Sequence, residues 1–208
     1  MNFMMSERTD PPEDLIGGGV VVAVVGPSGA GKDSVMNHAR ERLGDLAKDV
    51  SFVRRVITRE ANRNTEDHDS VDEEKFQRMV AEGAFAAHWF ANGLSYGLPV
   101  SMDRFVEGGG IVVANVSRAA IVQLRQRYAY VLPVVITAPA DVLAERLRKR
   151  GREGTEAIAE RLKRAEASEL AVEGEMTIVN DGTLDEASEK FIAALRKARA
   201  WSDVADSL

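Results

Sequence analysis

Hydrophobic and polar residues alternate along this chain in blocks that predict short strands separated by helices. Continuous apolar runs rich in Val and Ile indicate strands buried on both faces, and they cover 20–25, 111–116, 131–137 and 176–179. A further strand is expected at 50–57. Segments with helical spacing of apolar residues separate these runs, the first of them at about 32–43. Strands that alternate with helices predict an α/β fold with a parallel sheet core flanked by helices.

Polar residues at the ends of the apolar runs predict where several helices begin. The segments 70–73 and 183–186 have the spacing of capping boxes, each with a hydroxyl residue followed three positions later by Glu. Ser117 is expected to cap the helix that carries Ile121 and Leu124. Pro139 suits the first turn of the next helix.

Three stretches interrupt this regular pattern. Residues 58–70 are polar without periodicity, and we interpret them as a functional loop. Residues 84–100 are rich in aromatic side chains, and Gly93 and Gly97 mark turns in a strand excursion that lines a pocket. Residues 151–155 break the helical pattern, and Thr155 can cap another helix.

Length and composition indicate one globular domain with small additions. The chain has 208 residues, of which 45% are hydrophobic and 29% charged, so it can bury a substantial core. We expect a flexible N-terminal tail at 1–18, a single domain at 19–200 and a C-terminal tail at 201–208. Within the domain, the acceptor-binding region covers about 54–100 and a helical lid about 146–164.

The charge balance and the lack of cysteine exclude several classes of function. With 27 Lys and Arg against 33 Asp and Glu, the formal charge is −6, so we expect neither nucleic acid nor a membrane surface as a partner. There is no cysteine, which removes disulfides and thiol chemistry. The longest apolar run is too short to cross a bilayer, and the N-terminus lacks the pattern of a secretory signal, so a cytoplasmic location is expected.

The strongest chemical signal is a glycine-rich turn between the first strand and the first helix. It has the spacing G-x-x-x-x-G-K, in the strand-turn-helix context of a phosphate-binding loop. Lys32 is expected to reach the outer phosphates of ATP and to be catalytic. The predicted ATP-binding residues are Gly26, Pro27, Ser28, Gly29, Ala30, Gly31, Lys32, Asp33 and Ser34.

One position of this loop departs from the usual pattern. The residue after the lysine is ordinarily Ser or Thr, whose hydroxyl binds Mg²⁺. In this chain it is Asp33. A carboxylate is also a hard oxygen ligand, so Asp33 is the candidate ligand for Mg²⁺ bound with ATP.

Two groups of arginines supply the cations that phosphoryl transfer requires. The segment 54–59 together with Arg63 places several cations at the end of the strand at 50–57 and in the loop after it, and a phosphorylated acceptor would bind there. Arg150 and Arg161, in the lid, are predicted to be catalytic. The flanking Arg146, Arg148 and Lys163 are expected to be solvated, as is His68; His38 is expected on the surface.

No residue pattern indicates a dedicated general base, and a phosphate acceptor needs none. The second ionisation of a phosphate monoester has a pKa near ~6, so its oxygen is already anionic at neutral pH. The obstacle is then repulsion between two polyanions, which Mg²⁺, Lys32 and arginines relieve.

Several of these motifs resemble the guanylate kinase fold family over roughly residues 20–200. They are the glycine loop ending at Lys32, Ile57-Thr58-Arg59, Gly93-Leu94-Ser95-Tyr96-Gly97 and Arg146-Leu147-x-x-Arg150-Gly151 followed by Arg161-Leu162. The resemblance implies a P-loop kinase fold with an acceptor-binding excursion and a lid. It also implies that Asn180, in Asn180-Asp181, contacts adenine.

The acidic residues with which guanylate kinases bind guanine are missing. The expected glutamate falls at Ala87, and the expected Asp-x-Asp is Asn115-Val116-Ser117. Without those carboxylates the N–H groups of guanine have no acceptors, which costs several kcal/mol (~3) of discrimination in a buried site.

Further motifs narrow the resemblance to one subfamily: Lys32-Asp33-Ser34, the segment 88–97, Asn115-Val116-Ser117-Arg118-Ala119, Arg150-Gly151-Arg152-Glu153 and Asn180-Asp181-Gly182. They resemble the ribose 1,5-bisphosphate phosphokinases of phosphonate breakdown. This resemblance implies transfer of the γ-phosphoryl group of ATP onto the 1-phosphate, giving 5-phospho-α-D-ribose 1-diphosphate (PRPP) and ADP. The candidate acceptor-binding residues are Arg55, Arg59, His88, Asn92, Tyr96, Ser117 and Arg118. Two alternatives stay open: a nucleoside monophosphate (guanylate) kinase, and a guanylate-kinase-like interaction module without catalysis.

Overall fold

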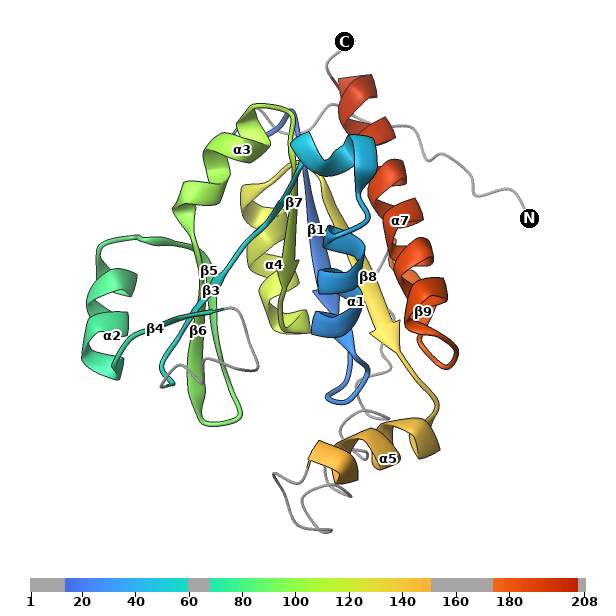
Figure 1. Ribbon diagram of the computed structural model, residues 1–208. Coiled ribbons are helices and arrows are strands. Elements are labelled where there is room, and N and C mark those ends of the chain that lie inside the picture. Colours follow the sequence, from blue (N-terminus) through green and yellow to red (C-terminus); the bar gives the residue numbers. More distant parts are fainter. Residues whose placement is uncertain (1–13, 60–67, 151–173, 206–208) are drawn as a thin grey trace.

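The computed structural model describes residues 14–59, 68–150 and 174–205, and it has two sheets (Figure 1). The central sheet is parallel, with the strand order β2-β7-β1-β8-β9. Its strands are β1 (Val20–Val25), β2 (Val50–Phe52), β7 (Ile111–Asn115), β8 (Val131–Thr137) and β9 (Met176–Val179). The expected α/β class with a parallel core is confirmed.

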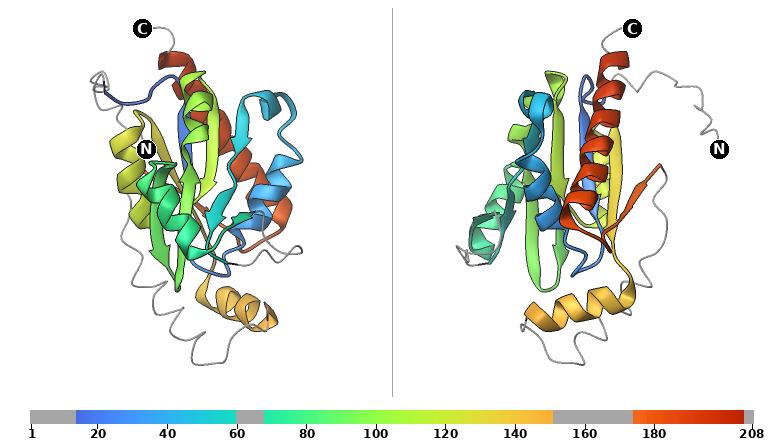
Figure 2. Two further views of the ribbon diagram at one scale, coloured as in Figure 1. Left: turned by 90° about the vertical axis from the view of Figure 1, so that its left-hand side faces the viewer. Right: turned by 45° about the vertical axis from the view of Figure 1, so that its right-hand side comes forward.

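The continuous apolar sequence of β1 is explained by helices on both faces of this sheet (Figure 2). Val20, Val22 and Val24 pack in a cluster with α1 (Lys32–Arg40) and α7 (Leu184–Ala205). The alternating residues Val21 and Val25 pack in the opposite cluster, with α3 (Asp103–Glu107) and α4 (Arg118–Arg127). Because both faces are covered, the strand has no polar position.

A second, smaller sheet stands beside the central one and forms the excursion predicted for residues 84–100. Its strand order is β4-β3-β6-β5, with β5 (Phe85–Ala91) at one edge. The other strands are β3 (Arg55–Ile57), β4 (His68–Ser70) and β6 (Leu94–Pro99), and α2 (Glu73–Ala81) lies against this sheet (Figure 1). The β5–β6 hairpin turns at Asn92 and Gly93, both with positive φ (52° and 77°), as a tight hairpin requires.

The single strand expected at 50–57 is wrong, because the chain changes sheets there. Val50–Phe52 pairs with β7 in the central sheet, whereas Arg55–Ile57 pairs with β4 and β6 in the smaller one. The amide of Val53 makes the last bond to the central sheet, at 2.9 Å from the Val113 carbonyl. Both halves are apolar enough to be strands, and only the pairing separates them.

Two local signals were also misplaced. The N-cap of α2 is Asp72, whose side chain accepts from the Lys75 amide at 2.7 Å, and not Ser70. Gly97 lies inside β6 and not in a turn; a Cβ there would lie 2.4 Å from the ring of Phe85. The glycine is needed for that close ring packing.

The other helix starts agree with the sequence. Ser117 accepts from the Ala120 amide at 3.3 Å and caps α4. In the 183–186 capping box, the Thr183 amide donates to Glu186 at 2.9 Å and the Glu186 amide donates to Thr183 at 3.2 Å. The helix α5 (Ala140–Arg150) follows Pro139 and buries Leu143 and Leu147 as expected. Two 3₁₀ turns complete the described elements, η1 (Gly44–Lys48) and η2 (Val100–Met102).

The described parts of the segments expected as tails pack against the domain. Helix α7 runs to Ala205, and Trp201 packs against the core, so the helix continues into the segment expected as a C-terminal tail. The hydroxyl of Ser202 donates to the Gly18 carbonyl at 2.7 Å and lies 2.8 Å from the Gly109 carbonyl. Ile16 forms a bridge with Tyr128. No helix among the described residues is long and apolar enough to span a membrane.

Candidate active site

The glycine loop connects β1 to α1 at the carboxyl edge of the central sheet. Gly26, Gly29 and Gly31 have φ of 141°, 89° and 83°. A Cβ on Gly26 would lie 1.9 Å from the Ile136 carbonyl oxygen, so a side chain is excluded there by sterics as well as by conformation. The loop is therefore built from the glycines that the motif predicted.

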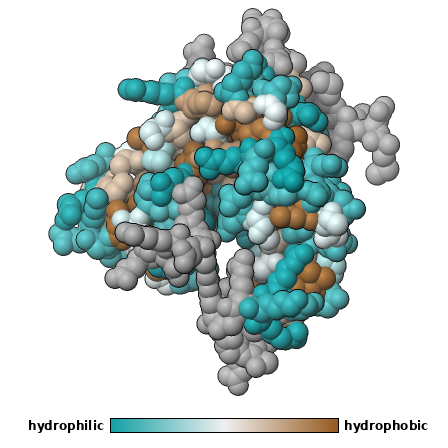
Figure 3. Space-filling view, in the orientation of Figure 1, coloured by the Kyte–Doolittle hydropathy of each residue, from teal (hydrophilic) through white to brown (hydrophobic). Residues whose placement is uncertain are grey.

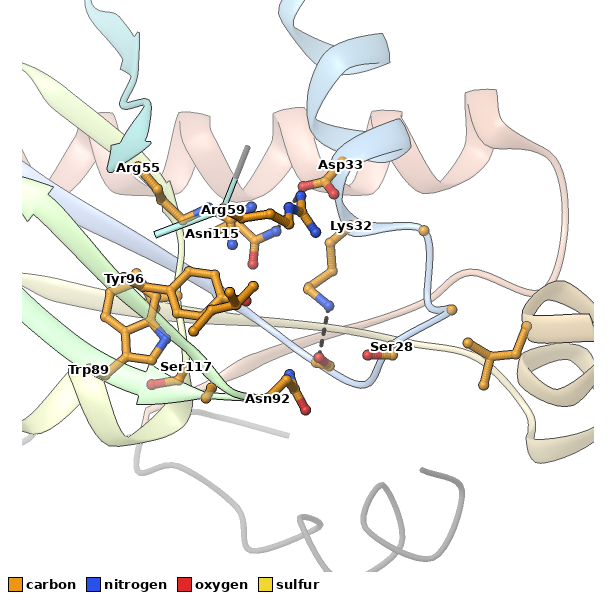
Figure 4. Close-up of a pocket in the computed structure, with 17 residues that line it drawn as sticks. Ser28, Lys32, Asp33, Arg55, Arg59, Trp89, Asn92, Tyr96, Asn115 and Ser117 are labelled. Atoms are coloured by element: carbon orange, nitrogen blue, oxygen red, sulfur yellow. Dashed lines mark hydrogen bonds between the residues drawn. The ribbon is translucent and has the colours of Figure 1, made fainter. Parts of the chain in front are cut away.

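Lys32 lies over this loop. Its Nζ donates to the carbonyl of Gly26 at 2.9 Å (Figure 4). It also donates to the carbonyl of Pro27 at 3.0 Å. The ammonium group thus caps the carbonyl side of the turn, next to the helix N-terminus, where an anion is favoured.

A cavity of about 420 Å³ opens between the glycine loop and the smaller sheet. Its size suits a small ligand. One wall comes from the loop and α1, one from β3, β5 and β6, and one from the carboxyl end of β7 (Figure 4). The lining residues are Gly26, Ser28, Gly29, Gly31, Lys32, Asp33, Arg55, Arg59, Trp89, Ala91, Asn92, Leu94, Tyr96, Asn115, Val116, Ser117 and Leu147.

Aromatic rings and a guanidinium group form the wall opposite the loop. The rings of Trp89 and Tyr96 are stacked, with centroids 5.5 Å apart and planes at 3°. The Arg55 guanidinium lies over the Tyr96 ring, 5.8 Å from its centroid. These contacts restrict the rotamers of all three side chains, so the wall is rigid.

A hydrogen-bond network holds the backbone immediately before Arg59. The Ser95 amide donates to the Thr58 hydroxyl at 2.9 Å, and the Thr58 amide donates to the Ser95 carbonyl at 3.1 Å. The Ser95 hydroxyl in turn donates to Glu73 of α2, at 3.2 Å. Arg59 directly follows Thr58, which makes two hydrogen bonds to Ser95, and Arg59 faces the cavity (Figure 4).

The charges around the cavity are mostly positive. Among the described lining residues three are cationic, Lys32, Arg55 and Arg59, and one is a carboxylate, Asp33. The Asp33 carboxylate accepts a hydrogen bond from the Asn115 side-chain amide at 2.7 Å. The wall formed by the smaller sheet thus presents cations and aromatic rings.

A second cavity, of about 310 Å³, lies on the other side of the glycine loop. Its lining includes Ser34 and Asn180, two of the residues predicted to bind ATP. The Asn180 amide donates to the Ala30 carbonyl at 2.8 Å and so ties the end of β9 to the loop. The remaining lining residues are Gly29, Gly31, Arg146, Lys149, Gly182 and Leu184.

Arg146 was wrongly expected to be solvated. It is half-buried and lines this second cavity, and its Nη1 is buried without a hydrogen-bond partner among the described residues. The signal was available in the sequence, because Arg146 lies three residues after the buried Leu143, and residues three apart are neighbours on a helix surface.

Two candidate acceptor residues do not line the first cavity. The side chain of His88 is exposed, while its amide and carbonyl both bond to the Gln123 side chain, at 3.0 and 2.8 Å. Arg118 is half-buried at the start of α4, outside the lining. Pro27 and Ala30 take part through their backbone carbonyls.

Some residues of the predicted site lie outside the described residues, and the exposure predicted for His68 is wrong. The Arg150 side chain, and Arg161 with the helix expected after Thr155, lie outside the described residues. His68, expected to be solvated, is only 3% exposed, because β4 pairs with β3 inside the smaller sheet. His38 is half-buried and bonds to Asp185 of α7 at 2.5 Å.

A glycine loop at the carboxyl edge of a parallel sheet, with a cation-lined cavity beside it, defines a phosphate-binding α/β protein. The family model for guanylate kinase matches residues 19–198. The chain belongs to the guanylate kinase family.

Within that family, the chain is similar to curated relatives named ribose 1,5-bisphosphate phosphokinase. One, from Chelativorans sp. (strain BNC1), is 56% identical over 188 residues, which cover 90% of this chain and 90% of the relative. Another, from Brucella melitensis biotype 2, is 47% identical over 180 residues, which cover 86% and 93%.

A solved structure supports the fold. The crystal structure of guanylate kinase from Anaplasma phagocytophilum aligns with a TM-score of 0.62, covering 87% of this chain and 86% of that one. The sequence identity is 22%, so this likeness bears on the fold alone.

Proposed function

We propose that this protein phosphorylates ribose 1,5-bisphosphate with ATP. An oxygen of the acceptor's 1-phosphate attacks the γ-phosphorus of ATP, and the bond from that phosphorus to the β-bridging oxygen breaks. The products are PRPP and ADP. The proposal places the reaction in phosphonate breakdown, in the cytoplasm, with a small phosphorylated sugar as the acceptor.

The charge of the first cavity is the structural observation that carries this proposal. Three lining cations face a space whose smaller-sheet wall holds no carboxylate among the described lining residues. Ala87, at the position expected for a guanine-binding glutamate, is buried and outside the lining. A bisphosphate is matched by such a wall, whereas the N–H groups of guanine need acceptors.

The relatives support the same substrate class. Both relatives described above have ribose 1,5-bisphosphate phosphokinase as their name, and the identity extends over nearly the whole domain. The rival guanylate kinase activity rests on the family context, and the non-catalytic module conflicts with a retained glycine loop and Lys32.

The two cavities meet at the loop, and the proposal assigns one to each substrate. The second cavity, with Asn180 and Arg146, accepts the nucleoside side of ATP, and the loop with Lys32 holds its phosphates. The acceptor lies between Arg55, Arg59 and the stacked Trp89–Tyr96 pair. The proposed acceptor-binding region of about 54–100 thus supplies one wall, and most of the lid expected at about 146–164 lies outside the described residues.

The residues at the loop fit a magnesium ion. Asp33 offers a hard oxygen ligand beside Lys32, and it lines the first cavity. When bound with ATP, Mg²⁺ neutralises charge on the β- and γ-phosphates. The protein's own contribution is electrostatic: Lys32 and the arginines hold two polyanions together, with Arg150 and Arg161 proposed as further catalytic cations.

The test is a direct comparison of acceptors. With ATP and Mg²⁺, purified protein should convert ribose 1,5-bisphosphate to PRPP, detected by its diphosphate signals in ³¹P NMR, while ADP release is measured by a coupled assay. GMP, tested in parallel, should give little ADP. Turnover of GMP without turnover of the sugar bisphosphate would contradict the proposal and favour the guanylate kinase. An absence of nucleotide binding would favour the interaction module.

A further inference from the structure

Asp33 and Asn115 come from different elements and meet at the base of the first cavity. Asp33 is the second residue of α1, and Asn115 is the last residue of β7, the strand next to β1. The Asn115 amide donates to the Asp33 carboxylate at 2.7 Å, and the asparagine is only 8% exposed. Figure 4 shows both side chains beside Lys32.

The chemistry of this pair is the reverse of the usual phosphate-loop arrangement. In that arrangement the residue after the lysine carries a hydroxyl, and the carboxylate that helps to hold the metal comes from the end of a strand. In this chain the carboxylate follows the lysine, and the strand β7 ends in a neutral amide. The site still contains one carboxylate, but on the other element.

The amide has two effects on its partner. Its N–H group holds the Asp33 carboxylate in one orientation, which reduces the entropy lost when a cation binds. It is also neutral; a carboxylate at this position would place a second negative charge within about 3 Å of the first, and the two would repel. Among the described residues that line this cavity Asp33 is the only carboxylate, so no other lining carboxylate could replace a misplaced Asp33.

We infer that Asn115 is a positioning residue that directs the Asp33 carboxylate towards the metal bound with the nucleotide, and that the two residues are an exchanged pair. The inference rests on the proposed function only for the presence of Mg²⁺ with the nucleotide. It does not depend on which acceptor is phosphorylated.

The inference is tested by nucleotide binding, without turnover. ADP affinity is measured by calorimetry with and without Mg²⁺ for the wild type and for Asn115→Asp, Asn115→Ala, Asp33→Thr and the double variant Asp33→Thr/Asn115→Asp. The wild type should bind ADP more tightly with Mg²⁺. Asp33→Thr and Asn115→Asp should each reduce this gain by about tenfold, and Asn115→Ala by less.

The double variant is the decisive protein, because it rebuilds the usual arrangement with the hydroxyl in the loop and the carboxylate on the strand. Compared with the single variants, it should recover at least half of the lost magnesium-dependent increase in ADP affinity, measured on a logarithmic scale. Asn37→Asp, which adds the same charge on the exposed side of α1, is the matched control and should behave like the wild type. Melting temperatures measured without nucleotide confirm that each variant is folded.

Three outcomes would overturn the inference. In the first, the double variant loses as much of the magnesium-dependent gain in ADP affinity as the two single variants together. In the second, Asn115→Ala keeps the magnesium dependence of the wild type. In the third, the wild type binds ADP equally well with and without Mg²⁺. A purely structural bond would lower the melting temperature and leave the magnesium dependence unchanged. Failure of the sugar bisphosphate as acceptor would leave all these results standing.

Discussion

The two ends of the central sheet use charged residues in opposite ways. At the carboxyl end, Lys32, Arg55 and Arg59 face a cavity whose described lining holds a single carboxylate. At the other end, Arg127 and the hydroxyl of Tyr128 both donate to Asp103, the latter at 2.5 Å. At this paired end the carboxylate is satisfied within the protein, whereas at the cationic end the excess of positive charge in the lining favours anionic ligands.

At the paired end, the pKa values of two groups are raised. Burial raises the pKa of Tyr128 above its ordinary value, and the bond to Asp103 raises it further. The side-chain bond to Asp103 also raises the pKa of Arg127. The paired end therefore contributes to stability, whereas the cavity at the cationic end is lined by three cations and one carboxylate, a balance that favours anionic ligands.

The largest effect should follow from removing the lysine of the cationic end. Lys32→Met keeps the length of the side chain but removes the charge over the loop, so kcat for the proposed reaction should fall by about a thousandfold or more. The melting temperature should change little, because the hydrogen bonds from Lys32 to the Gly26 and Pro27 carbonyls hold the loop and not the core. Retention of a tenth of the wild-type turnover would contradict its catalytic role.

Removing an acceptor-side cation should have a smaller and more selective effect. Arg55→Met should raise the KM for the sugar bisphosphate by about thirtyfold, because one phosphate loses a charged partner. The KM for ATP should stay within about twofold, since Arg55 lies on the opposite wall. Arg78→Met, on the exposed face of α2, is the matched control; equal effects from both variants would argue against a specific contact.

The paired end should respond in stability and not in activity. Asp103→Asn leaves Arg127 without its anion, and because this guanidinium is partly exposed we expect a loss of about 2 kcal/mol in the free energy of unfolding. Urea denaturation measures this loss. Acceptor KM should stay at the wild-type value at temperatures where the variant is folded. A change in KM would mean that the two ends are coupled.

The smallest effect concerns alkaline pH. Because the folded protein raises the pKa of Tyr128, this group stabilises the fold fully below the unfolded pKa near ~10, and the stabilisation is lost as pH rises beyond it. Above about pH 10, wild-type stability should therefore fall with pH more steeply than that of Tyr128→Phe, by up to about 1.4 kcal/mol per pH unit. Parallel curves for the two proteins would show that Tyr128 has no such role.

Features set by neighbouring residues could be predicted from the sequence. The bounds of β1 and β9, the glycine loop, the cap at Ser117 and the 183–186 capping box depend on a few adjacent positions, and all were found. The cationic loop after the second strand was also foreseen, and Arg55 and Arg59 do line one cavity with Lys32.

Features set by long-range pairing could not be predicted. The switch of sheets between Phe52 and Arg55 depends on partners about 40 to 60 residues away, and either half alone has the pattern of a strand. His68 is buried because of its place in the smaller sheet, although its sequence neighbours are polar. His88 was chosen for its chemistry, but the strand register turns its side chain away from the cavity, towards solvent.

The two hydrogen bonds between the Gln123 side chain and the His88 backbone have a consequence for self-association. Strand β5 is an edge of its sheet, and it carries Phe90, which is 73% exposed. Such an edge can recruit a strand from another molecule. Because the Gln123 amide already occupies both backbone groups of His88, a foreign strand cannot hydrogen-bond to that residue without first displacing a side chain from α4.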